Sequence, residues 1–291
     1  MSAPFSLRIF VADGDPDGLR VVERTNWIGK ALVFPRALLP KVKARDELGQ
    51  TGVYLLLGPR DDGEGDKFYI GEGDPIRPRL ESHYAQKDFW TREVCFLAVP
   101  GQLNKAHVQF LEANLVRLAK AAKRLPLDNA NTPAEPTLSE ADRADMLVFL
   151  DNMLEMLPVL GVHAFEQAPA AAAAVVTLLQ CKGKGAVASG YESSQGFVVT
   201  AGSQAVADTV PSMQQYVRGM YELRQELIAN GVLSPSSDTP ADGYRFTQDY
   251  VFSSPSTAAA VVLGRSANGR IEWKNGQGQT LKALQEREAS A

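Results

Sequence analysis

The stretch that decides the fold of this chain reads GVYLLLG at residues 52–58, FYIG at 68–71 and RLESH at 79–83. The first two segments are apolar, and each carries a tyrosine close to a glycine. A polar segment rich in Gly and Asp, residues 59–67, separates them. Short apolar segments joined in this way are typical of a β-hairpin. The sequence therefore predicts two strands that present two tyrosines, joined by a longish loop.

A basic pair follows the predicted hairpin. Arg79 and His83 are four residues apart, so they share one face if this segment is a helix. The nearby Pro75 and Pro78 are typical of the start of a helix. Arginine binds phosphate through paired N–H groups, and histidine can exchange a proton near neutral pH. Each residue alone is more often structural, but two phenols with Arg and His in this spacing indicate a site that binds phosphate and moves a proton.

These segments resemble the two halves of the signature of the GIY-YIG nuclease family. The first half corresponds to GVY at 52–54, where Val replaces the usual Ile, and the second to YIG at 69–71. In that family an Arg and a His follow the second signature tyrosine by ten and fourteen positions. Arg79 and His83 stand at these offsets from Tyr69.

Two later residues extend the resemblance, which covers about residues 50–132. A metal-binding Glu on a later helix matches Glu112, in the segment LEANL. A closing Asn, often in a Pro-x-x-Asn context, matches Asn129, and it would position the substrate or the groups around it. Asn131 competes with Asn129 because it also follows the helix, but Asn129 has the Pro-x-x-Asn context. Five matched features in order make the resemblance specific.

The resemblance implies a metal-dependent endonuclease that hydrolyses DNA phosphodiester bonds. Glu112 would supply an oxygen to Mg²⁺ or Mn²⁺, because Mg²⁺ is usually held by one or two carboxylates with waters and substrate phosphates. Arg79 would bind phosphate. Tyr54 or Tyr69 would activate the water, and His83 would accept the proton from Tyr54 or bind phosphate. A phenol is a poor base at neutral pH unless a nearby cation lowers its pKa.

The composition is that of an ordinary globular chain. With 291 residues, 45% hydrophobic and 22% charged, it predicts about two domains. The formal net charge of −4 gives no overall attraction to nucleic acid, so affinity for DNA requires a local patch. The two cysteines, Cys95 and Cys181, lack metal-ligand spacing and are expected to be reduced. The sequence shows neither a signal pattern nor a long apolar segment, which predicts a cytoplasmic protein that does not enter the membrane.

The residues before the signature predict an extension of the first domain or a small module. Residues 5–12 and 19–23 predict a hairpin, and residues 37–48 predict a short helix. This part is locally basic, so it either contacts the phosphate backbone or forms an ordinary solvated face. The basic residues are Lys30, Arg36, Lys41, Lys43 and Arg45.

Two helices are predicted after the third strand, which spans residues 93–99. The first, residues 106–125, has an apolar stripe and a basic surface on which Glu112 is the only acid. Arg117, Lys120 and Lys123 on this helix are candidate DNA contacts. The second helix, residues 139–157, begins with the capping residue Ser139. The alanine-rich segment 167–174 predicts a linker between domains.

A second small α+β domain is predicted at residues 175–285. Its predicted elements are helices at 212–229 and 257–263 and strands at 197–200, 246–252 and 271–274. The segment FSSPSTAAA at 252–260, with GRSANG at 264–269, resembles a small domain of unassigned function that trails many bacterial nucleases and modification enzymes. The resemblance implies a DNA-associated accessory role.

Three residues of this second domain allow two interpretations. Arg265 and Asn268 can bind base edges, and Trp273 can stack on a base, which suits a nucleic-acid surface. However, the surrounding glycines are what a tight turn requires, and a tryptophan on a strand usually lies in the core. The structural interpretation is favoured for these residues.

We therefore expect a two-domain α+β protein. Residues 1–160 form a GIY-YIG nuclease-like domain, with a small antiparallel sheet flanked by helices and a core at 50–132. Residues 175–285 form an accessory domain. The expected function is metal-dependent DNA cleavage. The alternative is a nucleic-acid-binding or assembly protein of a restriction or repair system, with little or no turnover, and self-association stays open.

Overall fold

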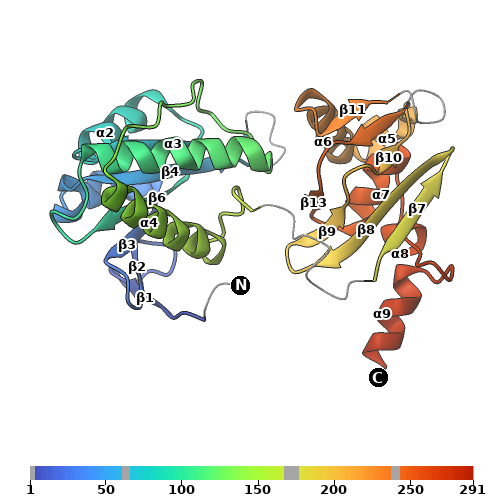
Figure 1. The fold of residues 1–291 in the computed structure, drawn as a ribbon, viewed down its shortest axis with the longest axis horizontal. Helices are drawn as coiled ribbons and strands as arrows, with labels where there is room; N and C mark the ends of the chain where they lie inside the picture. The colour runs from blue at the N-terminus through green and yellow to red at the C-terminus, as the bar shows by residue number, and fades with distance from the viewer. Residues whose placement is uncertain (1–3, 61–65, 167–176, 237–242, 291) are drawn as a thin grey trace. The chain divides into compact units, whose positions relative to one another are not determined.

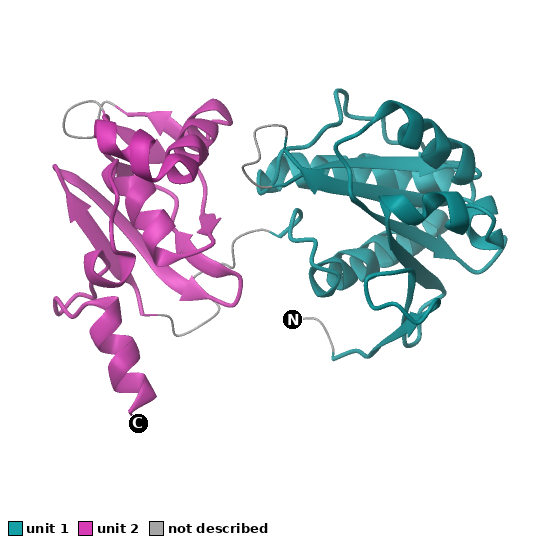
Figure 2. Cartoon of the chain, turned by 180° about the vertical axis from the view of Figure 1, so that it is seen from behind, with its two compact units in different colours: residues 1–166 teal, residues 167–291 magenta. Residues whose placement is uncertain are grey.

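The computed structural model describes most of the chain, namely residues 4–60, 66–166, 177–236 and 243–290. The chain divides into two compact units, residues 1–166 and 167–291 (Figure 2). Each unit combines antiparallel sheets with helices, which confirms the expected two-domain α+β fold. The predicted linker at 167–174, and residues 61–65 of the predicted hairpin loop, lie outside the described residues. Within the described part, no helix is both long and apolar enough to cross a membrane.

The first unit is built on a six-stranded sheet in which every neighbouring pair is antiparallel. The strand order is β1-β2-β3-β6-β4-β5. The strands are β1 Leu7–Val11, β2 Arg20–Arg24, β3 Gly29–Pro35, β4 Gly52–Pro59, β5 Asp66–Gly73 and β6 Arg92–Ala98. The predicted signature hairpin is therefore β4 and β5. The N-terminal hairpin joins the same sheet through β3, so it is an extension of this unit and not a separate module.

Helices cover both faces of this sheet (Figure 1). One face packs against α2, Arg77–Gln86, and contains Tyr54 and Leu56. The other packs against α3, Lys105–Ala122, and α4, Glu140–Val159. Residues 52–58 of β4 are all buried. Successive strand residues point to opposite faces, so β4 needs apolar residues on both faces, and this explains its continuous apolar sequence.

Two helices of this unit differ in length from the prediction. The expected helix at 37–48 is a 3₁₀ turn at Arg36–Leu38, α1 at Leu39–Val42 and a second 3₁₀ turn at Asp46–Gly49. Its apolar stripe stops after Val42, because charged residues occupy the next positions on that face. The expected helix at 106–125 ends at Ala122, because Lys123 adopts the left-handed conformation.

The second unit contains two small antiparallel sheets. One sheet consists of β7 Leu179–Gly183, β8 Ala186–Ser193, β9 Gly196–Val199 and β13 Tyr250–Phe252. The other consists of β10 Gln204–Ala205, β11 Leu233–Pro235 and β12 Tyr244–Phe246. The helices are α5 Pro211–Tyr216, α6 Arg218–Ala229, α7 Pro255–Leu263, α8 Gly269–Glu272 and α9 Leu281–Ala289. Every residue from Ala258 to Leu263 is buried, so α7 is the central helix of this unit.

Three expectations for this unit are wrong in detail. The predicted strand at 246–252 is two strands in different sheets, and Asp249 between them accepts a hydrogen bond from the Ala201 N–H at 2.7 Å. The predicted helix at 212–229 is interrupted at Val217, which is not helical. The first half of the predicted strand at 271–274 belongs to α8, because the Asn268 side chain caps a helix there, and Lys274 forms only isolated bridges with Gln180 and Thr280. Both cysteines are buried and free, as expected.

Candidate active site

The candidate site lies around β5, the edge strand of the first sheet. Residues 126–129 run beside its outer edge. The Phe68 N–H donates to the Pro126 carbonyl at 3.1 Å, and the Asp128 N–H donates to the Phe68 carbonyl at 2.7 Å. The side chain of Asn129 continues this ladder: its Oδ1 accepts from the Ile70 N–H at 2.9 Å and its Nδ2 donates to the Ile70 carbonyl at 2.8 Å.

The predicted role of Asn129 in positioning substrate is thus joined by a structural one. Its amide replaces a peptide group of a neighbouring strand, which satisfies backbone groups that an edge strand leaves unpaired. It therefore fixes the backbone directly after Tyr69. Asn131, the competing candidate, is exposed.

The two predicted tyrosines lie on the same face of the sheet. Tyr54 on β4 is completely buried, Tyr69 on β5 is half-buried, and their ring centroids are 6.4 Å apart. Gly71 stands opposite Tyr54 in the strand register. A Cβ at Gly71 would lie 2.5 Å from Tyr54 Cζ, so only glycine leaves room for the phenol. The glycine beside Tyr69 is thus required by the tyrosine on the other strand.

His83 contacts both tyrosines from α2. Its Nε2 is 2.9 Å from Tyr54 Oη, and its ring meets the Tyr69 ring edge-on with centroids 4.8 Å apart. Burial lowers the pKa of His83 to about 4, and the charges of Arg79 and Lys87 act in the same direction. His83 is therefore neutral near pH 7 and can accept the phenolic hydrogen of Tyr54 at Nε2.

Arg79 lies one helical turn before His83 and acts on both phenols. Burial raises the pKa of Tyr54 and of Tyr69, and Arg79 opposes this through its charge and by hydrogen bonding to each of them. The burial effect is larger. A tyrosine acts as a base at neutral pH only if a nearby cation lowers its pKa below the usual value. Arg79 alone does not lower the pKa of either tyrosine that far.

Glu112 on α3 approaches this group from the other face of the sheet. It is half-buried, and burial raises its pKa to about 7, with a further contribution from the nearby charge of Glu72. The charges of Arg79 and Lys105 act against this rise. The structure thus brings together residues from four elements: Tyr54 from β4, Tyr69 from β5, Arg79 and His83 from α2, and Glu112 from α3.

Glu72 and Lys105 belong to the same site, although the sequence analysis did not single them out. Lys105 Nζ lies 2.6 and 2.8 Å from the two carboxylate oxygens of Glu72. Glu72 directly follows Gly71 on β5, and Lys105 precedes Glu112 by seven residues, which is two helical turns. Their positions next to the signature glycine and two turns before Glu112 could have pointed to both residues from the sequence.

The donor set at this site fits a hard divalent cation. Among the described residues, no group of three or more His, Cys, Asp or Glu side chains is placed to hold a metal ion. Mg²⁺ does not require such a group, because it is commonly bound by one or two carboxylates with waters and substrate phosphates. The negative charges of Glu72 and Glu112 disfavour each other here, and a divalent cation would relieve this repulsion. Glu112 is the carboxylate that would hold it.

The predicted DNA contacts on α3 already have partners within the protein. Arg117 Nη2 donates to Asn114 Oδ1 at 2.6 Å, and Lys120 Nζ donates to Thr132 Oγ1 at 2.6 Å. Both side chains belong to exposed residues, so they can still meet a ligand. Lys123 forms the C-cap of α3.

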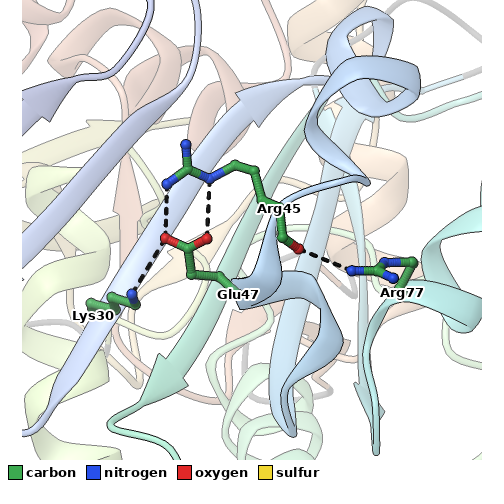
Figure 3. A network of polar contacts seen from close by, with 4 residues as sticks. All are labelled: Lys30, Arg45, Glu47 and Arg77. Atoms are coloured by element: carbon green, nitrogen blue, oxygen red, sulfur yellow. Dashed lines mark hydrogen bonds and ion pairs between the residues drawn. The ribbon is translucent and has the colours of Figure 1, made fainter.

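The basic residues of the N-terminal part are mostly engaged in internal contacts. Figure 3 shows the Glu47 carboxylate between Lys30, at 3.5 Å, and Arg45, at 2.8 and 3.2 Å. Burial acts to raise the pKa of Glu47, but the hydrogen bonds and charge of Arg45, together with the charge of Lys30, lower it. Arg77 at the start of α2 donates to the Arg45 carbonyl at 3.0 Å. This network fixes the start of the helix that carries Arg79.

In the second unit, the residues considered for nucleic-acid binding have structural roles. The Trp273 side chain is completely buried, and its Nε1–H donates to the Pro255 carbonyl at 3.0 Å. Asn268 caps α8 by accepting from the Arg270 N–H at 3.1 Å. Arg265 pairs with Glu272 at 2.7 Å. Trp273 is therefore a core residue and not a stacking platform.

Comparison with known proteins bears on the second unit alone. Residues 179–285 are similar to a family described as a domain of unknown function, DUF4357. No curated protein and no solved structure matches the chain. The matched residues begin at β7 and end within α9, so the match corresponds to the folded part of the second unit.

Proposed function

We propose that the first unit is a metal-dependent endonuclease of the GIY-YIG type that hydrolyses phosphodiester bonds of DNA in the cytoplasm. The observation that carries the proposal is the Tyr54 Oη–His83 Nε2 contact of 2.9 Å. Arg79 lies beside this pair, and the half-buried Glu112 completes the group. Two phenols, an imidazole, a guanidinium and a carboxylate around one strand edge supply what this hydrolysis requires.

The Tyr54–His83 pair suits proton transfer in spite of the raised phenolic pKa. A free phenolate would be costly in this buried place. However, Tyr54 can pass its own proton to the neutral His83 Nε2 while its oxygen takes a proton from the attacking water. The phenol then stays neutral throughout, and the low pKa of His83 keeps its Nε2 available as the acceptor.

Arg79 would hold the scissile phosphate, because its planar guanidinium can donate two parallel hydrogen bonds to phosphate oxygens. A Mg²⁺ or Mn²⁺ ion on Glu112 would neutralise phosphate charge and stabilise the leaving oxygen. Tyr69 packs edge-on against His83 and keeps the imidazole in place.

The test is cleavage of plasmid, branched and single-stranded DNA by the purified chain, with Mg²⁺ or Mn²⁺ and with a chelator. Cleavage should require the metal and should be lost in Glu112→Gln, which keeps the shape but removes the ligand charge. Glu81→Gln is the matched control, because Glu81 lies on α2 in an exposed pair with Lys43. Cleavage by Glu112→Gln at the parent rate would exclude Glu112 as the metal ligand.

A second candidate function is binding of nucleic acid or assembly into a larger restriction or repair complex, without turnover. The observation in its favour is that burial raises the pKa of both phenols, so neither is a ready base on its own. Under this alternative, the chain binds DNA but no metal or DNA form leads to cleavage.

A further inference from the structure

The ion pair between Lys105 and Glu72 is asymmetric in its exposure. The Lys105 side chain is 52% exposed, whereas that of Glu72 is 14% exposed. Glu72 follows Phe68 and Ile70 on the same face of β5, the face covered by α3. Both of its carboxylate oxygens contact the ammonium group, at 2.6 and 2.8 Å. The carboxylate is thus fixed in the protein, and it holds a cation that solvent can reach.

This arrangement differs from that of an ordinary surface ion pair. Exposed pairs contribute little to stability, and both partners usually reach into solvent. Here the carboxylate is largely withdrawn from solvent beside a second carboxylate, Glu112, whose pKa it helps to raise. An ammonium group has three N–H donors, and Glu72 occupies two of them. Within the described part of the chain, the third donor has no protein acceptor and is available to a ligand.

The position of Lys105 relative to Arg79 suggests the ligand. Both cations act on Glu112, so both lie close to the proposed metal ligand. Lys105 is also the first residue of α3, where the helix dipole adds a partial positive charge. Two cations close to one carboxylate, the proposed metal ligand, suit successive phosphates of a nucleic-acid chain.

We propose that Lys105 binds a phosphate of the DNA substrate next to the phosphate held by Arg79, and that Glu72 positions the Lys105 ammonium group for this contact. The inference rests on the proposed function, since it assigns a substrate contact to the same site. Lys105 is a substrate-binding residue, and Glu72 is a positioning residue that acts through it.

The first test measures DNA binding without cleavage. A short duplex is titrated with the full chain in Ca²⁺ over a range of salt concentrations, for the parent and for Lys105→Met, Lys105→Arg and Lys282→Met. Loss of one phosphate contact should reduce the slope of log K against log salt by about 1 and weaken binding several-fold. Lys105→Arg should retain the slope.

Lys282→Met is the matched control for this titration. Lys282 on α9 lies 3.7 Å from Glu286 in an ion pair, and its side chain is 53% exposed, close to the value for Lys105. It is not among the residues considered for contact with DNA. The control should leave the slope unchanged. An unchanged slope in Lys105→Met, or a lack of DNA binding by the parent, would overturn the proposal.

The second test concerns Glu72 and uses cleavage kinetics. Glu72→Gln removes a negative charge, so DNA binding should not weaken, but kcat should fall by about ten- to a hundredfold because the phosphate is no longer held in register. In the Lys105→Met background, Glu72→Gln should cause little further loss. An equal loss of kcat in both backgrounds would show that Glu72 acts independently of Lys105.

The two proposals can fail separately. If the parent does not cut DNA but Lys105→Met changes the salt dependence of DNA binding, the endonuclease proposal is refuted and the phosphate contact is supported. A parent that cuts DNA with an unchanged slope in Lys105→Met removes the phosphate contact alone.

Discussion

We expect the buried Glu93 to make the free energy of unfolding fall as the pH rises. It lies on β6, its side chain is completely buried, and its Oε1 accepts a hydrogen bond from the Cys95 thiol. Among the described residues, nothing donates to or accepts from its Oε2. Burial raises the pKa of Glu93 to about 8 from an ordinary value of 4.5. The folded protein therefore keeps this carboxyl protonated at pH values at which the unfolded chain ionises it.

The sign and size of the effect follow from proton linkage. Below pH 4.5 Glu93 is protonated in both states, so its contribution to stability is fully present there. As the pH rises from 4.5 to about 8, the unfolded chain releases the proton and the folded chain does not, so stability is lost. At 1.36 kcal/mol per pH unit, the loss amounts to about 3–5 kcal/mol. This is a large part of the stability of a typical domain.

Glu93→Gln should remove this dependence, because glutamine has nearly the same shape and does not ionise. The free energy of unfolding of the variant should equal or fall slightly below that of the parent near pH 5 and exceed it by about 3 kcal/mol near pH 8. Urea titration of the intact chain, followed by pulsed hydrogen exchange of β6 peptides, reports on the first unit separately.

Glu81→Gln on the exposed side of α2 serves as the control, and its difference from the parent should not vary over this pH range. Stability curves of Glu93→Gln and parent that stay parallel from about pH 5 to about pH 8 would refute the reasoning. They would mean that Glu93 is ionised in the folded protein or reaches solvent.

Three further predictions concern the candidate site. Arg79→Ala should abolish cleavage and Arg79→Lys should restore little of it, since an ammonium group cannot make the paired contact; full activity of the Lys variant would mean that only charge matters there. Gly71→Ala should lower the free energy of unfolding by about 1–3 kcal/mol by overpacking against Tyr54, measured by thermal unfolding, and an unchanged Tm would contradict the close contact. A fragment of residues 1–166 should fold and retain metal-dependent cleavage, which Tyr54→Phe should remove; a folded but inactive fragment would place essential residues in the second unit.

Local sequence patterns predicted the strands and helices in which burial sets the spacing of apolar residues. The apolar segments at 52–58 and 68–71 became β4 and β5, and the helical stripes after residue 105 became α3 and α4. These patterns work because one face, or both faces, of each element must be apolar. The prediction failed where a side chain accepts a hydrogen bond from a backbone N–H and ends a regular element, as Asn268 and Asp249 do.

The candidate site was only partly predictable for a related reason. The spacing of Arg79 and His83 is local, so a helix brings them to one face. Glu72 and Lys105 are 33 residues apart, and only the packing of α3 against β5 makes them an ion pair. The second role of Asn129, pairing with the backbone of Ile70, likewise depends on a contact between segments 59 residues apart.

The pair of Tyr54 and His83 links the stability of the fold to the chemistry proposed for it. Both side chains are buried, and each is the partner that the other needs, at 2.9 Å. Removing the Tyr54 hydroxyl would leave the His83 Nε2 without that partner, at a cost of about 1–3 kcal/mol. The same burial raises the phenolic pKa and lowers the imidazole pKa, so it favours the uncharged pair over a phenolate with an imidazolium. A buried, neutral phenol–imidazole pair can hand on a proton without either group carrying a charge at rest, and this is why it can be both a packed part of the core and a proton relay.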